Sequence, residues 1–124
     1  MKLLIVDNSV PVRKRLNDMF ESIPGIEVIQ AAELAEGYAQ LRQSMPNAMV
    51  LDLQFPCGNG FELLGYAKQN FPSMIVLVNT NAISFCERCM ALGADFFFDK
   101  SLEINELVDT IISCRDRLLS AGQP

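Results

Sequence analysis

Short aliphatic runs alternate with amphipathic segments along the chain. Most of the runs lack polar residues, which is typical of strands in a parallel sheet that helices cover on both faces; they span residues 3–6, 26–31, 48–53, 74–78 and 96–98. The intervening segments repeat apolar residues every three or four positions, which predicts helices; they span residues 10–23, 34–45, 61–71, 83–92 and 102–119. This alternation of strand and helix predicts a doubly wound α/β sheet.

Turn-forming residues separate these elements and support the assignment. Proline or glycine follows most of the predicted helices, and residues 55–60 read Phe-Pro-Cys-Gly-Asn-Gly, a composition typical of a loop. The length of 124 residues suits one domain. We therefore expect a single domain over residues 1–124 with no output domain attached.

Polar side chains gather where the predicted strands end. In a doubly wound sheet, ligands bind at the carboxyl ends of the strands, where the strand order reverses. Two carboxylates, a carboxamide and an ammonium would meet there, and such oxygen ligands suit Mg²⁺. A carboxylate beside Mg²⁺ can act as a nucleophile towards a phosphoryl group. The strand ends in question are Asp7-Asn8, Asp52, Val78-Asn79-Thr80 and Asp99-Lys100.

The overall charge narrows the range of partners. Fifteen acidic residues against ten basic ones give a net charge of −5, which disfavours nucleic acid and anionic membranes as partners. One basic cluster, Arg13-Lys14-Arg15, is interpreted as the solvated face of the first helix rather than a contact to phosphates. No apolar run is long enough to cross a bilayer, and the first one ends in Asp7 as a strand would. We expect a cytoplasmic protein.

Four cysteines are best interpreted as reduced thiols that pack in the core or lie on the surface. Cys86 and Cys89 form a Cys-x-x-Cys motif, but it falls inside a predicted helix and not between a strand and a helix as a thioredoxin-like motif does. The chain has no histidine, so a zinc site lacks ligands.

Three blocks of sequence resemble the response-regulator receiver family, which the chemotaxis response regulator typifies. The resemblance covers essentially the whole chain and implies a flavodoxin-like doubly wound (βα)5 three-layer sandwich with a five-stranded parallel sheet. The blocks are residues 4–9 (Leu-Ile-Val-Asp-Asn-Ser) with Val12-Arg13, residues 50–56 (Val-Leu-Asp-Leu-Gln-Phe-Pro) with the Gly-Asn-Gly of residues 58–60, and residues 91–101, which contain Asp99-Lys100.

The resemblance also implies a role for each matching residue. Asp52 matches the phosphoacceptor, and Lys100 matches the lysine that contacts the phosphoryl group. Asp7, Asp52 and the backbone carbonyl of Gln54 match the ligands of Mg²⁺. Phe97 matches the switch aromatic that rotates when the domain is phosphorylated.

The sequence departs from the family pattern at several of these positions. Asn8 stands where the family has a second acidic metal ligand. Its amide oxygen can still coordinate the metal but carries no charge, so we expect Mg²⁺ to bind weakly. Counting fifteen residues back from Gly93 places Val78 at the position of a conserved threonine or serine hydroxyl in the family, with Thr80 as a substitute if the loop is shifted. Ser101 replaces a common proline, and Phe97 replaces a common tyrosine.

Two hypotheses follow from the resemblance. In the first, the chain is a stand-alone receiver of a two-component phosphorelay that accepts a phosphoryl group on Asp52 from a sensor histidine kinase or a phosphotransfer protein. It then signals to a protein target through its fourth helix, fifth strand and fifth helix, a face that could also form a homodimer, and it is not an enzyme beyond self-catalysed phosphotransfer and dephosphorylation. In the second, it is a pseudo-receiver that binds a partner without phosphorylation.

A third class, a flavodoxin-like cofactor binder, is disfavoured. Such a protein needs a phosphate-cradling loop rich in glycine, serine and threonine after the first strand. Residues 8–11 read Asn-Ser-Val-Pro and do not form such a loop.

Overall fold

The computed structural model describes residues 1–121, so the predicted end of the domain at residue 124 lies outside the described residues. Five parallel strands form one sheet in the order β2-β1-β3-β6-β7. They are β1 (Lys2–Val6), β2 (Glu27–Ala31), β3 (Ala48–Leu51), β6 (Ile75–Thr80) and β7 (Phe96–Asp99). The helices are α1 (Val10–Glu21), α2 (Leu34–Ser44), α3 (Phe61–Asn70), α4 (Cys86–Ala91), which follows the 3₁₀ helix η1 (Ile83–Phe85), and α5 (Ile104–Ala121). The predicted fold class is confirmed.

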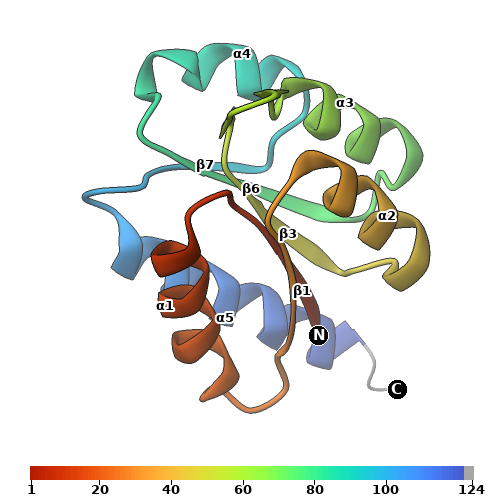
Figure 1. The fold of residues 1–124 in the computed structure, drawn as a ribbon. Coiled ribbons are helices and arrows are strands. Elements are labelled where there is room, and N and C mark those ends of the chain that lie inside the picture. Colours follow the sequence, from red (N-terminus) through yellow and green to blue (C-terminus); the bar gives the residue numbers. More distant parts are fainter. Residues whose placement is uncertain (122–124) are drawn as a thin grey trace.

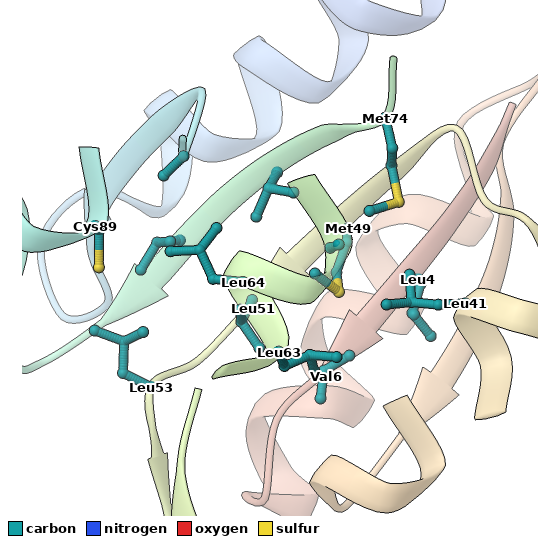
Figure 2. Close-up of a cluster of buried hydrophobic side chains, with 14 of the residues drawn as sticks. Leu4, Val6, Leu41, Met49, Leu51, Leu53, Leu63, Leu64, Met74 and Cys89 are labelled. Carbon is teal, nitrogen blue, oxygen red and sulfur yellow. The ribbon is translucent and has the colours of Figure 1, made fainter. Parts of the chain in front are cut away.

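Helices cover both faces of the sheet, with α1 and α5 on one side and α2, α3 and α4 on the other (Figure 1). We call these two sides of the sheet the α1–α5 face and the α2–α4 face. Side chains alternate between the faces along each strand. Figure 2 shows the core on the α2–α4 face, where Val6 and Leu51 pack against α3. The core on the α1–α5 face includes Ile5, Val50 and Leu77.

The register aligns the carboxyl ends of the strands at one edge of the sheet. Val6 pairs with Leu51, Leu51 pairs with Val78, and Val78 pairs with Phe97. The first strand lies between β2 and β3, so the chain reverses its direction of travel across the sheet there. This reversal is the switch point at which doubly wound sheets bind ligands.

The third strand is shorter than predicted, because it ends at Leu51 and not at residue 53. Oδ1 of Asp52 accepts hydrogen bonds from the backbone N–H groups of Leu53 at 2.7 Å and Gln54 at 3.3 Å. This local bonding turns the backbone out of the sheet. The predicted loop that follows contains a small antiparallel hairpin of β4 (Gln54–Phe55) and β5 (Gly58–Asn59).

Other boundaries also differ from the sequence-based ranges. The strand predicted for residues 74–78 extends to Thr80, because its pairing with β7 continues to Asp99. The helix predicted for residues 83–92 divides into η1 and a short α4, and α5 begins at Ile104.

The cysteines are all free thiols, as predicted. Cys89 and Cys114 are buried, and burial raises the pKa of the Cys89 thiol to about 11. Cys57 is exposed in the hairpin loop.

In residues 1–121, no helix has both the length and the hydrophobicity that a membrane span requires. The cytoplasmic location stays a prediction.

Candidate functional site

Three charged residues directly follow three different strands. Asp7 follows β1, Asp52 follows β3, and Lys100 follows β7. The hydrogen bonding of the sheet continues to these three residues. The backbone N–H group of each one donates to a carbonyl of the neighbouring strand at 3.0 to 3.1 Å. Val6 and Leu51 point to the α2–α4 face and Phe98 to the α1–α5 face. Alternation therefore directs all three charged side chains to the α1–α5 face.

The ammonium of Lys100 joins the two carboxylates. Its Nζ lies 2.7 Å from Oδ2 of Asp7 and 2.8 Å from Oδ2 of Asp52. The exposed fractions of the three side chains are 12% for Lys100, 4% for Asp7 and 6% for Asp52. Since β6 and β3 separate β7 from β1, the lysine side chain extends across the end of β6 to reach both acids. The structure thus brings together the three charged residues that the strand order predicts.

The other oxygen of each carboxylate is fixed by the backbone. Oδ1 of Asp7 accepts from the N–H of Ser9 at 2.8 Å, as Oδ1 of Asp52 does from Leu53. Each acid therefore directs its Oδ2 towards Lys100.

Arg13 also supports the site, through the backbone of β1. Its Nη1 donates to the carbonyl of Asp7 at 2.6 Å, and the side chain is half-buried. The interpretation of the basic cluster as a solvated face holds for the exposed Lys14 and Arg15 but is wrong for Arg13. The sequence gives no periodic signal for this contact, because it depends on how α1 packs beside the end of the strand.

Burial and ion pairing shift the ionisation of the site in opposite directions. Burial raises the pKa of Asp7 above its usual value, while the hydrogen bonds from Lys100 and Ser9 act to lower it. Burial alone would lower the pKa of Lys100, but the bonds to Asp52 and Asp7 outweigh it and the pKa is raised. Lys100 therefore stays protonated at neutral pH.

The geometry of the acids fits a small hard cation. Their two Oδ2 atoms both contact the ammonium of Lys100, so the two acids already hold one positive charge between them. Mg²⁺ commonly binds through one or two carboxylates and keeps several waters. Among the described residues, no three His, Cys, Asp or Glu side chains form a metal-binding group. Such a site would depend on Asp7 and Asp52 with backbone oxygens and water.

Asn8 follows Asp7 directly, but its side chain makes its hydrogen bond outside the cluster. Its Nδ2 donates to the carbonyl of Ala32 at 3.3 Å, and the residue lines a pocket of about 290 Å³ together with Glu33 and Cys57. Gln54 is exposed and adjoins Asp52 through its backbone N–H. The metal-binding roles of Asn8 and of the Gln54 carbonyl stay predictions.

The residue that β6 contributes to the site is Asn79, and the expectation for Val78 is wrong. Val78 is fully buried and points into the core on the α2–α4 face. Thr80 points to the same side, and its Oγ1 accepts from the N–H of Ala82 at 3.2 Å, so it does not substitute for Val78 in the site. Alternation places Asn79 with Leu77 on the α1–α5 face, and its exposed fraction is 4%.

Counting back from Gly93 misplaced this position because the η1–α4 segment is short and β6 continues to Thr80. One feature of the sequence could have identified Asn79: it is the one carboxamide in the run Ile-Val-Leu-Val-Asn-Thr of β6. The pairing of Leu51 with Val78 then places Asn79 level with Asp52.

The aromatic residues lie mostly in the core. Phe97 is half-buried and packs against the core on the α2–α4 face, and its role as a switch stays a prediction. Phe98 is buried, and the half-buried Phe96 stacks on it with ring centroids 6.2 Å apart. Phe85 is 41% exposed, and its ring packs in a T-shaped arrangement with that of Phe61, with the ring centroids 5.1 Å apart.

Comparison with known proteins gives one consistent result. The sequence matches the family described as the response regulator receiver domain over residues 3–112. A protein-glutamate methylesterase/protein-glutamine glutaminase from Oleidesulfovibrio alaskensis is 32% identical over 106 residues, which cover 82% of this chain and 29% of that protein. The corresponding protein of Halalkalibacterium halodurans is 31% identical over 90% of this chain and 35% of its own length. The chain thus spans about a third of the length of these curated relatives.

Solved structures agree with the fold. A CheY-like response regulator receiver domain protein from Methanospirillum hungatei superposes with a TM-score of 0.86 at 26% identity and covers 98% of both chains. The response regulator domain of Thermotoga maritima CheB gives a TM-score of 0.78 at 23% identity, over 100% of this chain and 98% of that one.

Proposed function

This chain belongs to the response regulator receiver domain family, and from that membership we propose that it accepts a phosphoryl group on Asp52. The observation that supports this best is the contact of Lys100 with both Asp52 and Asp7 at the carboxyl edge of the sheet. A buried carboxylate beside an ammonium combines a nucleophile with a group that stabilises added negative charge.

The proposed transfer begins at Oδ2 of Asp52, the oxygen that faces Lys100. This oxygen attacks the phosphorus of a phosphohistidine on a sensor histidine kinase or a phosphotransfer protein. The new O–P bond forms as the P–N bond breaks, and the imidazole nitrogen keeps the electron pair. Hydrogen bonds from Leu53 and Gln54 hold Oδ1 and so fix the orientation of the nucleophile. Lys100, 2.8 Å from Oδ2, neutralises part of the charge on the phosphoryl oxygens.

We propose that Mg²⁺ is held by Asp7, Asn8, Asp52 and the backbone carbonyl of Gln54, and that it binds weakly because the amide of Asn8 is uncharged. When bound, the ion supplies positive charge to the oxygens of the transferred group. Asp7 supports this role because its Oδ1 is already oriented by Ser9, which leaves Oδ2 to face the cation.

The proposed output is a contact with a protein target through the α4–β7–α5 face. Ile83, Met90 and Leu102 supply exposed apolar side chains in and beside these elements, with exposed fractions of 56%, 46% and 79%. A homodimer through the same face is an alternative use of this surface. Sedimentation at increasing protein concentration shows whether the chain self-associates and so distinguishes a homodimer from binding of another protein. The methylesterase and glutaminase activities that the relatives' names carry are not proposed for this chain.

The test is incubation with Mg²⁺ and acetyl phosphate, followed by intact-mass spectrometry. We expect a gain of one phosphoryl group that is absent in Asp52→Asn. Asp109→Asn, at an exposed carboxylate on α5, is the matched control and should gain the group as the wild type does. Absence of any gain at high Mg²⁺ would instead support the pseudo-receiver hypothesis.

A further inference from the structure

The strand β7 forms one edge of the sheet, and two helices flank it. It is the last strand in the sheet order, and both α4 and α5 contact it, one from each face of the sheet (Figure 1). The α4–β7–α5 face is therefore a strand edge with a helical border on either side. The side chains of these two borders decide what the surface can bind.

The border on α4 mixes apolar and acidic side chains. Ile83, Glu87 and Met90 are exposed and follow one another at intervals of four and three residues, so they lie on the same side of the η1–α4 segment. Another side of this segment faces α3, because Arg88 and Leu92 line a cavity together with residues of that helix. The stripe from Ile83 to Met90 therefore points away from α3, towards the edge of the sheet.

The border on α5 is acidic as well. Thr110 and Ser113 line a small cavity with Phe96 of β7, so this side of the helix faces the strand. Glu106 lies four residues before Thr110 and therefore on the same side, nearer the carboxyl edge of the sheet. Asp109 is exposed on the adjoining surface of the helix. Both borders of the face thus carry exposed carboxylates.

The basic side chains of the same part of the chain are engaged elsewhere. Arg88 stacks on an aromatic ring of α3, 3.8 Å from its centroid. Lys100 is held between the two acids of the site. Arg115 donates to a carbonyl of the α1–β2 loop at 2.8 Å, away from β7, and Arg117 lies near the C-terminal end of α5. Within residues 83–121, no base is therefore placed to neutralise the carboxylates of the two borders.

The acids of this face have no ionic partner among residues 1–121. Glu87, Glu106 and Asp109 are exposed, and none of them takes part in an ion pair there. A negative border around apolar side chains is complementary to a positively charged partner. A symmetric contact between two copies would place the same patch against itself, so that acids would face acids. Charge therefore favours a basic partner over a second copy.

We infer that the α4–β7–α5 face binds a basic amphipathic helix of another protein. Such a helix presents an apolar stripe beside lysine or arginine side chains. Its apolar stripe would pack on Ile83, Met90 and Leu102, and its cations would pair with Glu87 and Glu106. This inference rests on the output surface of the proposed function and names the chemistry of its partner.

The experiment uses a fluorescent helical peptide of leucine and lysine, with the leucines spaced three and four residues apart. Its anisotropy is measured as the full chain is added, at rest and with acetyl phosphate and Mg²⁺. We expect saturable binding that Glu87→Gln/Glu106→Gln weakens about fivefold, the combined size of two exposed ion pairs. Leu102→Ser should also weaken binding, because it removes an exposed apolar contact. A peptide with glutamate in place of lysine should not bind.

Glu21→Gln/Glu27→Gln is the matched control, because it changes the net charge equally through exposed acids on α1 and on β2, the opposite edge strand. Its affinity for the lysine peptide should equal that of the wild type. An equal loss in this control, or wild-type affinity in Glu87→Gln/Glu106→Gln, would overturn the inference. Sedimentation that shows a dimer which Leu102→Ser dissociates would assign the face to a second copy and overturn it as well.

Intact-mass spectrometry of the same samples separates this inference from the proposed phosphorylation. A wild type that binds the lysine peptide through this face but gains no phosphoryl group would refute phosphorylation of Asp52 and support the basic partner. A wild type that gains the group but does not bind the lysine peptide in either state would refute the inference alone.

Discussion

Replacement of Lys100 by methionine tests whether the ammonium holds the two buried acids in the resting protein. The substitution keeps much of the side-chain volume and removes the charge. Asp7 and Asp52 would then face each other with exposed side-chain fractions of 4% and 6% and no cation between them. Removal of one partner from a buried ion pair costs about 3 to 5 kcal/mol, because the remaining charge is not compensated. Lys100 is 12% exposed, so we expect the low end, about 3 kcal/mol at pH 7.5 without Mg²⁺.

The pH dependence of this loss has a defined sign. In the wild type, burial raises the pKa of Asp7 and Lys100 acts to lower it. In the variant, burial and the charge of Asp52 still raise the pKa of Asp7, and of the lowering contributions only the hydrogen bond from Ser9 remains. The folded-state pKa of Asp7 therefore rises further above 3.8. A raised folded-state pKa gives stability that is present below the unfolded value and lost as the pH rises through the folded value. The deficit of the variant should therefore be small near pH 4 and complete at pH 7.5.

The assay is urea unfolding of both proteins at pH 4.5, 6 and 7.5, with Lys14→Met on the exposed face of α1 as the control. The control should stay within about 0.5 kcal/mol of the wild type at each pH. The thermal midpoint of Lys100→Met should fall by roughly 10 °C at pH 7.5. A deficit below about 1 kcal/mol, or one of equal size at all three pH values, would refute the reasoning that the carboxylates depend on Lys100.

Three further predictions test the surroundings of the site. Asn8→Asp should raise the Mg²⁺ affinity roughly tenfold in isothermal titration calorimetry, because a carboxylate adds charge beside the cation; an unchanged affinity would exclude position 8 from the metal site. Gly60→Ala should destabilise by about 2 kcal/mol in urea unfolding, since its new Cβ would lie 2.7 Å from the backbone oxygen of Asp52. Gly65→Ala, with nothing within 4 Å of the new Cβ, should stabilise α3 by about 0.5 to 1 kcal/mol. If Gly65→Ala were the more destabilising of the two variants, that result would contradict the described packing. With Ellman's reagent at pH 8, Cys57 should react fast and Cys57→Ser should abolish that phase, whereas Cys89, buried and with a pKa of about 11, should react only on unfolding.

The sequence predicts the sheet well because burial on both faces leaves a simple pattern. The runs at residues 3–6 and 48–51 are fully apolar and form β1 and β3. The boundaries are harder to predict where side chains bond to their own backbone. The strand before Asp52 ends because the Asp52 carboxylate accepts hydrogen bonds from the N–H groups of Leu53 and Gln54. The hydrophobic pattern of the sequence does not predict that turn.

The site is predictable only as far as the strand ends are. Asp7, Asp52 and Lys100 each follow a strand directly, so the order of elements suffices to bring them together. Asn79 depends on register as well. The hydrogen bonds between β3 and β6 decide which residue is level with Asp52, and a count from a distant glycine fails when the intervening helix is short.

The two carboxamides at this edge, Asn8 and Asn79, have a consequence for the charge of the loaded site. At rest, two carboxylates and one ammonium leave one net negative charge. A phosphoryl group on Asp52 would replace one negative charge by up to two. A bound divalent cation would then bring the site to neutrality, with Asp7 and Lys100 cancelling each other. A second acid at position 8 would leave the loaded site negative but would attract the cation more strongly before loading. The amide at that position therefore lowers the affinity for the metal in both states. Because phosphorylation makes the site more negative, it should raise the affinity for Mg²⁺.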